Sequence, residues 1–231
     1  MAERPIYIPY TEGARLVKEI MISFEWNPGF APIQKKKNIA ALHTAAAARG
    51  YAPLLEISTK SDEELGERLS AFNLTVELKN GNVTTMEAAF QGSKVFERGG
   101  PYSDIYALSS REAKKDERTK NSGKIIGFDF EGVKFPSEPK TAFYDWLYCR
   151  ALAPHKDYLG RLDKYAGFTD IEFNPGKSIN CQARSCALFL ALCKKNLLEM
   201  ATQSPESFVN TVSMDSYAQP YSDDVRQGRL L

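Results

Sequence analysis

Three polar residues, Glu87, Gln91 and Lys94, follow one another at spacings of four and three in VTTMEAAFQGSKVFERGGPY, residues 83–102. If this stretch forms one short helix, the three side chains share a face. A glutamate can accept and return protons, and a lysine without its proton is a nucleophile. Gln91 carries both a hydrogen-bond donor and an acceptor and could bind a polar ligand. The row could therefore supply an acid–base group (Glu87), a nucleophile (Lys94) and, between them, a residue that binds the ligand (Gln91).

The same spacing also fits an ordinary solvated helix. Thr84 and Glu87 match a capping box, in which the glutamate folds back on the start of the helix. Gln91, Lys94 and Arg98 would then face water. From spacing alone, this second interpretation is favoured.

A glycine-rich turn follows the polar row. Gly99 and Gly100 precede Pro101, and glycines there could let backbone amides approach a phosphate closely. Glycines also end helices for structural reasons alone. The turn is therefore a weak signal by itself.

Composition and charge narrow the class of protein. The chain has 231 residues, 43% of them apolar, and a formal net charge of +1. A protein of this composition is globular, and any binding to nucleic acid must use local basic patches. QKKKN (34–38) and the lysines of 114–124 are candidate contacts to a DNA backbone, although charge runs are more often simply solvated.

The standard motifs of metal and cofactor sites are missing from the sequence. The two histidines lie away from the four cysteines, and CQARSC has no partner pair, so buried thiols are favoured over a zinc site. No phosphate-binding glycine fingerprint or hydrolase elbow occurs. We expect no metal and no organic cofactor. Without a signal-peptide pattern or an apolar run of membrane-spanning length, we expect a cytoplasmic protein with no membrane contact.

The elements that must position the polar row follow from periodicity and turn signals. We expect strands within 16–26 and 53–58, a helix from 33 to a stop at Gly50, and a helix capped by Ser61. NLTVEL with the Asn80-Gly81 turn predicts a hairpin edge, and IIGFDFEGVKFP predicts a hairpin. Two later helices are expected in TAFYDWLYCRALAPHK, ended by Pro154, and in INCQARSCALFLALCKKNLLEMA, the most apolar and central one. The expected fold class is α+β, predominantly helical.

Several strings together resemble the NADAR family. They are EAAFQGSKVFERGGPYSDIY, PKTAFYDWLYCRAL and AGFTDIEFNPGKSINCQARSCALF. The front part, FEWNPGFAPIQKKKNIAALH, is similar to the branch associated with DarT-type toxins, which ADP-ribosylate guanine in DNA. The resemblance implies a NADAR helical domain at 81–210, an N-terminal α/β extension at 1–80, and a C-terminal tail at 211–231.

The resemblance also implies an activity and a site. It implies a glycosidase that removes ADP-ribose from guanine in DNA, releases ADP-ribose, and serves as the antitoxin to a DarT-type toxin. Glu87 and Lys94 match the family's catalytic pair, with Lys94 either forming a Schiff base or holding the ribose hydroxyls or diphosphate. The candidate substrate-binding residues are Phe90, Gln91, Gly99, Gly100, Tyr102, Lys120, Trp146 and Arg150.

Some of these residues also have plain structural interpretations. Phe90 and Trp146 could stack on a base or lie in the core, and Arg150 could bind the diphosphate or form a surface salt bridge. Asn180 and Gln182 could reach the site, although capping of the central helix is favoured. Two rival functions stay open: an N-glycosidase acting on phosphorylated riboflavin-pathway intermediates, and a non-catalytic antitoxin that binds ADP-ribose or the toxin.

Overall fold

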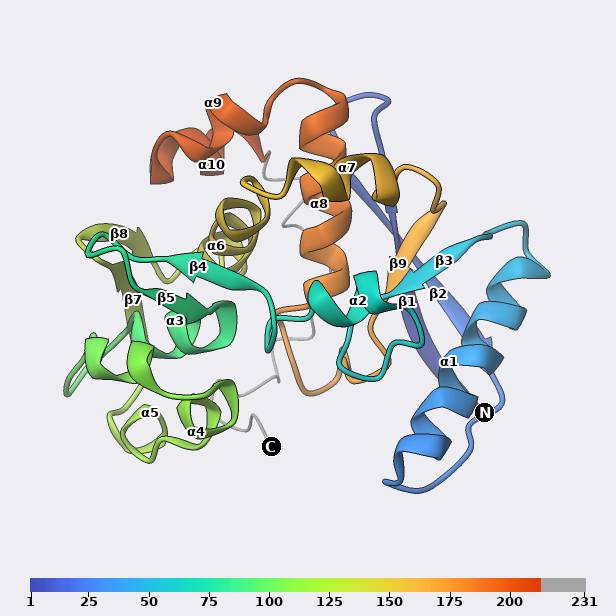
Figure 1. Cartoon of the computed structure of the whole chain (residues 1–231), viewed down its shortest axis with the longest axis horizontal. Helices are drawn as coiled ribbons and strands as arrows, with labels where there is room; N and C mark the ends of the chain where they lie inside the picture. Colours follow the sequence, from blue (N-terminus) through green and yellow to red (C-terminus); the bar gives the residue numbers. More distant parts are fainter. Residues whose placement is uncertain (213–231) are drawn as a thin grey trace.

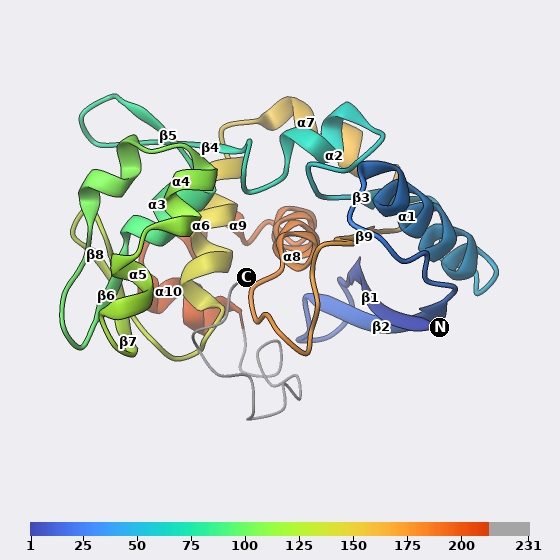
Figure 2. The same ribbon diagram turned by 90° about the horizontal axis from the view of Figure 1, so that it is seen from below.

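The computed structural model describes residues 1–212, and Figures 1 and 2 show the chain from two perpendicular directions. Within this range the strands form three sheets, of four, two and three strands. Most of the tail expected at 211–231 lies outside the described residues. The boundary expected near residue 80 remains a prediction.

Strands from both halves of the chain build the largest sheet. They are β1 (Ala2–Pro9), β2 (Val17–Phe24), β3 (Leu54–Glu56) and β9 (Gly167–Thr169), in the spatial order β2-β1-β9-β3. β1 pairs antiparallel with β2 along its whole length, and β9 pairs parallel with β3. The strands expected within 16–26 and 53–58 are confirmed. Through β9, this sheet joins the N-terminal segment to the later part of the chain.

Strand β1 was not among the expected elements. It contains Pro5 and Pro9, and proline cannot donate to a sheet ladder. The structure tolerates both prolines in an interior strand because β1 pairs with β9 only at Tyr7, opposite Phe168. Neither proline therefore has to donate a hydrogen bond to β9.

Two helices follow the first strands. Helix α1 (Pro32–Ala47) confirms the expected helix, and Gly50 follows it with a positive φ of 85°. Helix α2 (Glu64–Arg68) begins later than expected, with Glu63 at its N-cap. The Oγ of Ser61 instead accepts the N–H of Glu63 in a turn before the helix. The expected capping role of Ser61 is therefore wrong.

The middle of the chain forms the lobe at the left of Figure 1. Its elements are β4 (Thr75–Glu77), β5 (Val83–Thr85), α3 (Met86–Gly92), β6 (Lys94–Phe96), a 3-10 helix (Ser103–Ala107), α4 (Ser110–Lys115), α5 (Arg118–Asn121), β7 (Ile125–Phe130) and β8 (Val133–Pro136). β4 pairs with β5, and β6, β7 and β8 form an antiparallel sheet. Both expected hairpins are confirmed.

The later helices supply the centre of the core. They are α6 (Ala142–Leu152), α7 (Lys156–Leu162), α8 (Gln182–Lys194), α9 (Leu198–Thr202) and α10 (Pro205–Thr211). α8 runs through the middle of the molecule in Figure 1, as expected of the most apolar helix. The single helix expected over residues 179–201 is instead broken at Asn196, which lies between α8 and α9 with a positive φ of 55°. A buried ion pair between Arg184 of α8 and Asp145 of α6 ties the two central helices together.

Sheets and helices share this fold more evenly than expected. Nine strands alternate with helices along the described residues, so a predominantly helical fold is not confirmed, whereas a mixed α/β content is. All four cysteines are free, and Cys149, Cys181 and Cys186 are buried. A helix with the length and apolar character to cross a membrane does not occur among residues 1–212.

Candidate functional site

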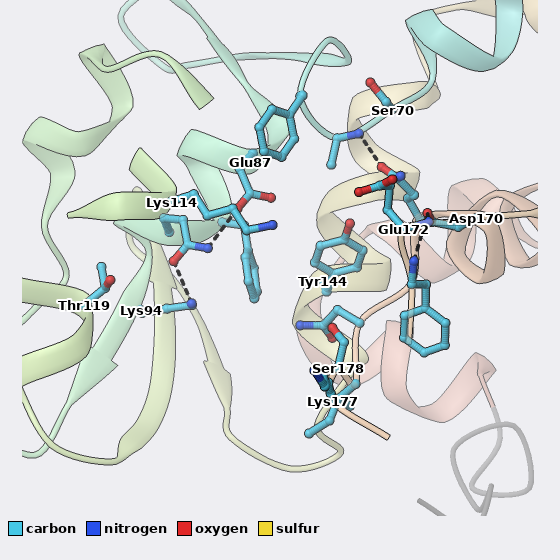
Figure 3. A pocket seen from close by; sticks show the side chains of 18 of the residues that line it. Ser70, Glu87, Lys94, Lys114, Thr119, Tyr144, Asp170, Glu172, Lys177 and Ser178 are labelled. Carbon is cyan, nitrogen blue, oxygen red and sulfur yellow. Dashed lines mark hydrogen bonds between the residues drawn. The ribbon is translucent and has the colours of Figure 1, made fainter. Parts of the chain in front are cut away.

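A cavity of about 590 Å³ lies beside helix α3. Its volume falls in the range of ligand-binding pockets. The wall is assembled from segments far apart in the sequence, including 58–60, 70–72, α3, β6, α4 and the loop 170–182 that leads into α8. Figure 3 shows the side chains that line it.

A chain of hydrogen bonds joins the three residues of the polar row in this wall. Nε2 of Gln91 donates to Oε1 of Glu87 at 2.9 Å, and Nζ of Lys94 donates to Oε1 of Gln91 at 2.7 Å. The three residues are only 7%, 3% and 4% exposed, yet all line the cavity. The solvated-face interpretation of the row is therefore wrong.

Two different elements position this chain. Glu87 and Gln91 lie one turn apart on α3, whereas Lys94 is the first residue of strand β6, so the expected single helix ends at Gly92. A side chain at Gly92 would collide with the ring of Tyr106, since a Cβ there would lie 2.5 Å from Cε1. Gly92 thus lets Tyr106 pack against the end of α3, where the chain enters β6 and Lys94 bonds Gln91.

The expected capping box does not form. The N-cap of α3 is Thr85, whose Oγ1 accepts the N–H of Ala88. The hydroxyl of Thr84 donates instead to the carbonyl of Tyr106. Because Thr85 caps the helix, the carboxylate of Glu87 is free to bond Gln91 and face the cavity.

Burial changes the chemistry of Lys94. The pKa of its amine falls from 10.5 to about 8, mainly because burial removes solvation; the charge of Glu87 opposes this shift, and the positive charge of Lys114 adds to it. At pH 7 about one lysine in ten is then uncharged, whereas an ordinary lysine is uncharged less than one time in a thousand. The ring of Phe90 packs below the amine, 4.7 Å from Nζ to the ring centroid. Lys94 is therefore equipped to act as a nucleophile.

The opposite wall carries two further acidic residues and a tyrosine. In Figure 3, Tyr144 of α6 lies between Glu87 on one side and Asp170 and Glu172 on the other. Burial raises the pKa of the Asp170 carboxyl well above its usual value, and the nearby carboxyl of Glu56 raises it further. Oδ1 of Asp170 accepts the backbone N–H of Glu172 at 3.0 Å. The Asp170 carboxyl on this wall is therefore more readily protonated than an exposed aspartate.

Cationic side chains predominate around the cavity. Among the described residues, those that line it are Lys60, Lys94, Arg111, Lys114, Lys120, Lys140 and Lys177, against the acidic Glu87, Asp170 and Glu172. Such an excess of positive charge in a cavity concentrates anionic ligands. The arrangement suits a ligand with several phosphate groups.

Three of the expected substrate-binding residues line the cavity together with Glu87 and Lys94. Phe90 and Gln91 lie in the wall, and Lys120 lies in the rim. Phe90 also contacts Tyr144 edge to face, with ring centroids 5.1 Å apart. Phe90 thus supports both Lys94 and Tyr144.

Gly99, Gly100 and Tyr102 lie outside the cavity lining. A Cβ at Gly100 would lie 2.3 Å from the carbonyl oxygen of Lys94, so this glycine allows the turn to fold against β6. The hydroxyl of Tyr102 bonds that of Ser122 at 2.6 Å. The turn therefore supports the backbone of Lys94.

Trp146 and Arg150 do not line the cavity, although Tyr144 on the same helix does. Trp146 is buried against Phe143 and Phe135. The guanidinium of Arg150 lies over the rings of Trp146 and Phe130, at 5.4 and 5.7 Å from their centroids. The burial of Trp146 favours a role in the core over stacking on a base. Arg150 contacts aromatic rings, which neither of its two expected roles, diphosphate binding and a surface salt bridge, had included.

The loop before α8 reaches the cavity, where capping was expected. The N-cap of α8 is Cys181, without a side-chain cap, and both Asn180 and Gln182 line the cavity. Oε1 of Gln182 accepts the N–H of Ala71 at 2.7 Å, which joins two walls. The favoured capping role of Asn180 and Gln182 is wrong.

Several lining residues escaped the sequence analysis, among them Lys60, Arg111, Tyr144, Asp170 and Lys177. They belong to elements separated by more than a hundred residues, and no spacing pattern connects them. A sequence signal existed for Tyr144, Asp170 and Lys177, which lie in strings already matched to the family.

Comparison with known proteins identifies the family. A search of the curated proteins finds no match to this chain. The family model described as "DarT1-associated NADAR antitoxin" matches residues 2–222, which is nearly the whole chain. The chain belongs to the family of DarT1-associated NADAR antitoxins.

Proposed function

We propose that this protein hydrolyses the N-glycosidic bond between ADP-ribose and guanine in DNA and thereby reverses the modification made by a DarT1 toxin. The observation that carries the proposal is Lys94, a buried amine with a pKa of about 8 that faces a cation-lined cavity together with Glu87. A neutral amine beside a carboxyl group is suited to exchange at an anomeric carbon.

The cavity supports a substrate of this class. ADP-ribose brings a diphosphate, and DNA brings a phosphate at each nucleotide, so both partners match the cations of the rim. Gln91 holds the amine of Lys94 and the carboxylate of Glu87 in one hydrogen-bonded chain. Because both groups are held in place before the substrate binds, no further entropy is lost in bringing them together at the reacting carbon.

In the proposed reaction, Glu87 takes part in its protonated form and first delivers its proton to the ribose ring oxygen. The ring opens, and an iminium forms between the anomeric carbon and the guanine nitrogen. The neutral amine of Lys94 adds to this carbon, and Glu87 carries a proton from the lysine nitrogen to the guanine nitrogen. Guanine then leaves as its free amine, and a protonated Schiff base remains on Lys94.

Water completes the cycle. It adds to the Schiff-base carbon while Glu87 takes one of its protons. Collapse of the resulting carbinolamine breaks the bond to Lys94, with Glu87 protonating the lysine nitrogen and regaining a proton from the hydroxyl. The open-chain aldehyde of ADP-ribose closes to its ring form. One water molecule is consumed, and Glu87 and Lys94 return to their starting states.

Release of ADP-ribose from a guanine-modified oligonucleotide tests the proposal. The wild-type protein should release ADP-ribose and restore guanine, and Glu87→Gln should be at least a hundredfold slower because it loses its acid–base group. Glu97→Gln, which changes a glutamate absent from the cavity lining, is the control. Absence of release by the wild-type protein would reject the hydrolase.

The same variants distinguish catalysis from sequestration. If the protein acts by hydrolysis, only variants that keep Glu87 should restore growth to cells that express the toxin. If Glu87→Gln restores growth as well as the wild type, the protein acts by binding, and the catalytic proposal is wrong.

A further inference from the structure

One aromatic residue in the cavity wall differs from the others in its exposure. Six aromatic residues of the described part of the chain line the cavity, and five of them are buried: Phe90, Phe96, Phe128, Tyr144 and Phe173. Phe72 is the sixth, and it is only half-buried. Phe72 belongs to none of the hydrophobic clusters formed within residues 1–212. Packing in the core therefore does not account for its place in the wall.

The two residues that the sequence offered for stacking on a base are already packed. The ring of Phe90 contacts those of Phe128 and Phe143, at 5.8 and 6.1 Å between centroids, and Nζ of Lys94 lies over it. Trp146 is buried outside the cavity lining. A base could reach either ring only by displacing these contacts. The half-buried ring of Phe72 needs no such rearrangement.

Hydrogen bonds hold the backbone of Phe72 beside Glu87. The carbonyl of Ala71 accepts the backbone N–H of Glu87 at 2.9 Å, and the N–H of Ala71 donates to Oε1 of Gln182 at 2.7 Å. The carbonyl of Phe72 itself accepts the hydroxyl of Ser110 at 2.9 Å. The segment is thus tied to α3, to α4 and to the start of α8, so the fold fixes where Phe72 lies relative to Glu87.

Lys114 relates the ring of Phe72 to the amine of Lys94. Nζ of Lys114 lies 5.4 Å from the centroid of the Phe72 ring, and its positive charge acts on the amine of Lys94. Figure 3 shows Glu87, Lys94 and Lys114 on the same side of the cavity. A flat group bonded to a carbon that Glu87 and Lys94 both reach would therefore lie near the Phe72 ring.

A half-buried aromatic ring in a cationic cavity suits a nucleobase. Bases stack on aromatic side chains, and every base can do so because each has a π face. Phosphate groups are bound by cations, and ribose hydroxyls by hydrogen-bonding groups. Phe72 has neither a charge nor a polar side chain, so a base is the part of the proposed substrate that fits it. Guanine is bonded directly to the reacting carbon, whereas adenine is separated from it by a diphosphate and two ribose rings.

We propose that the ring of Phe72 is the surface on which the guanine base of the substrate stacks, next to Glu87 and Lys94. This inference rests on the proposed hydrolase activity, because it names the part of the same cavity that holds the leaving base. It gives Phe72 a role in binding and orienting guanine and none in proton transfer.

Activity on the ADP-ribosylated guanosine mononucleotide tests this role. Phe72→Leu keeps an apolar side chain but loses the aromatic face, so kcat/KM should fall about tenfold, mainly through a higher KM. Phe72→Tyr keeps the ring and should keep the wild-type KM. Phe30→Ala removes an exposed phenylalanine outside the cavity lining and is the control. A wild-type KM in Phe72→Leu would overturn the inference, as would an equal rise of KM in Phe72→Tyr.

Binding without chemistry separates base stacking from the hydrolase. Calorimetric titration should show guanosine monophosphate binding about tenfold more weakly to Phe72→Leu than to the wild type, while ADP-ribose, which lacks guanine, binds both equally. If the wild type shows this pattern but releases no ADP-ribose from any substrate, the hydrolase fails and the stacking role stands. Absence of guanosine monophosphate binding to the wild type would overturn the stacking role. So would weaker binding of ADP-ribose alone, which would assign the ring to adenine, or equal weakening of both ligands.

Discussion

The amine of Lys94 donates a 2.7 Å hydrogen bond to Oε1 of Gln91, so its partner in the site is a neutral amide. The carboxylate of Glu87 is the next group along, bonded to the other end of the same amide. Gln91 therefore holds a carboxyl group and an amine in one site without pairing them directly. This separation lets burial lower the pKa of Lys94 to about 8.

Gln91→Glu tests the separation. A carboxylate in place of the amide would lie against the amine and raise the lysine pKa. The midpoint of the pH–activity curve should then move above pH 8, and activity at pH 7 should fall more than tenfold, since one pKa unit changes the neutral fraction about tenfold. Gln91→Met, which adds no charge, should keep the midpoint at or below pH 8. An unshifted Gln91→Glu profile would contradict the account.

Lys114 should tune the same amine from the rim. Its positive charge lowers the pKa of Lys94, so Lys114→Met should move the pH midpoint of kcat upward. Lys120→Met removes another rim cation that also lines the cavity and serves as the control. Both variants should raise KM for the anionic substrate, and only the first should shift the midpoint. A shift of equal size in both would assign the effect to the general charge of the rim.

The buried lysine should also destabilise the folded protein below alkaline pH. Folded Lys94 has a pKa of about 8, and the unfolded chain has a lysine pKa near 10.5. Between these values the unfolded state binds more protons, so the contribution of Lys94 to stability is full above pH 10.5 and is lost as pH falls through 8. The size of the change is about 3 kcal/mol.

Lys94→Met isolates this contribution. Urea unfolding from pH 7 to pH 10 should show the wild type gaining stability relative to the variant, because the other titrating groups are common to both. A constant difference between the two proteins across this range would show that Lys94 keeps an ordinary pKa.

The pair Asp145–Arg184 should govern the stability of the core behind the cavity. Both side chains are almost fully buried, and Asp145 also accepts the hydroxyl of Ser185. Asp145→Ala should cost about 3–5 kcal/mol in the free energy of unfolding, because it removes a buried countercharge from Arg184. The exposed pair Lys194–Asp163 offers a control, in which Asp163→Ala should cost less than about 1 kcal/mol. Similar losses in both would contradict this assignment.

Local sequence signals predicted much of the fold. The helix ending before Gly50 and the two hairpins were all read from periodicity and turn residues, and the structure confirms them. Strand β1 was not predicted; it contains two prolines, which only the narrow pairing at Tyr7 makes acceptable in an interior strand. Such a feature depends on a partner strand at 167–169, which no local pattern reveals.

Only the part of the candidate site that lies on one short segment was predictable from the sequence. The spacing of Glu87, Gln91 and Lys94 marked three residues that line the cavity, but it also favoured a solvated helix, because burial comes from the walls that fold over α3. Tyr144 and Asp170 reach the cavity from elements distant in sequence. Their convergence is a property of the tertiary packing.

Borohydride trapping on a guanine-ADP-ribosylated oligonucleotide tests the central claim most directly. Reduction during turnover, followed by peptide mass analysis, should place an ADP-ribose adduct on Lys94 in the wild-type protein, and Lys94→Ala should give neither adduct nor ADP-ribose release. Release of ADP-ribose by Lys94→Ala at the wild-type rate, with no adduct on the wild-type lysine, would contradict the account.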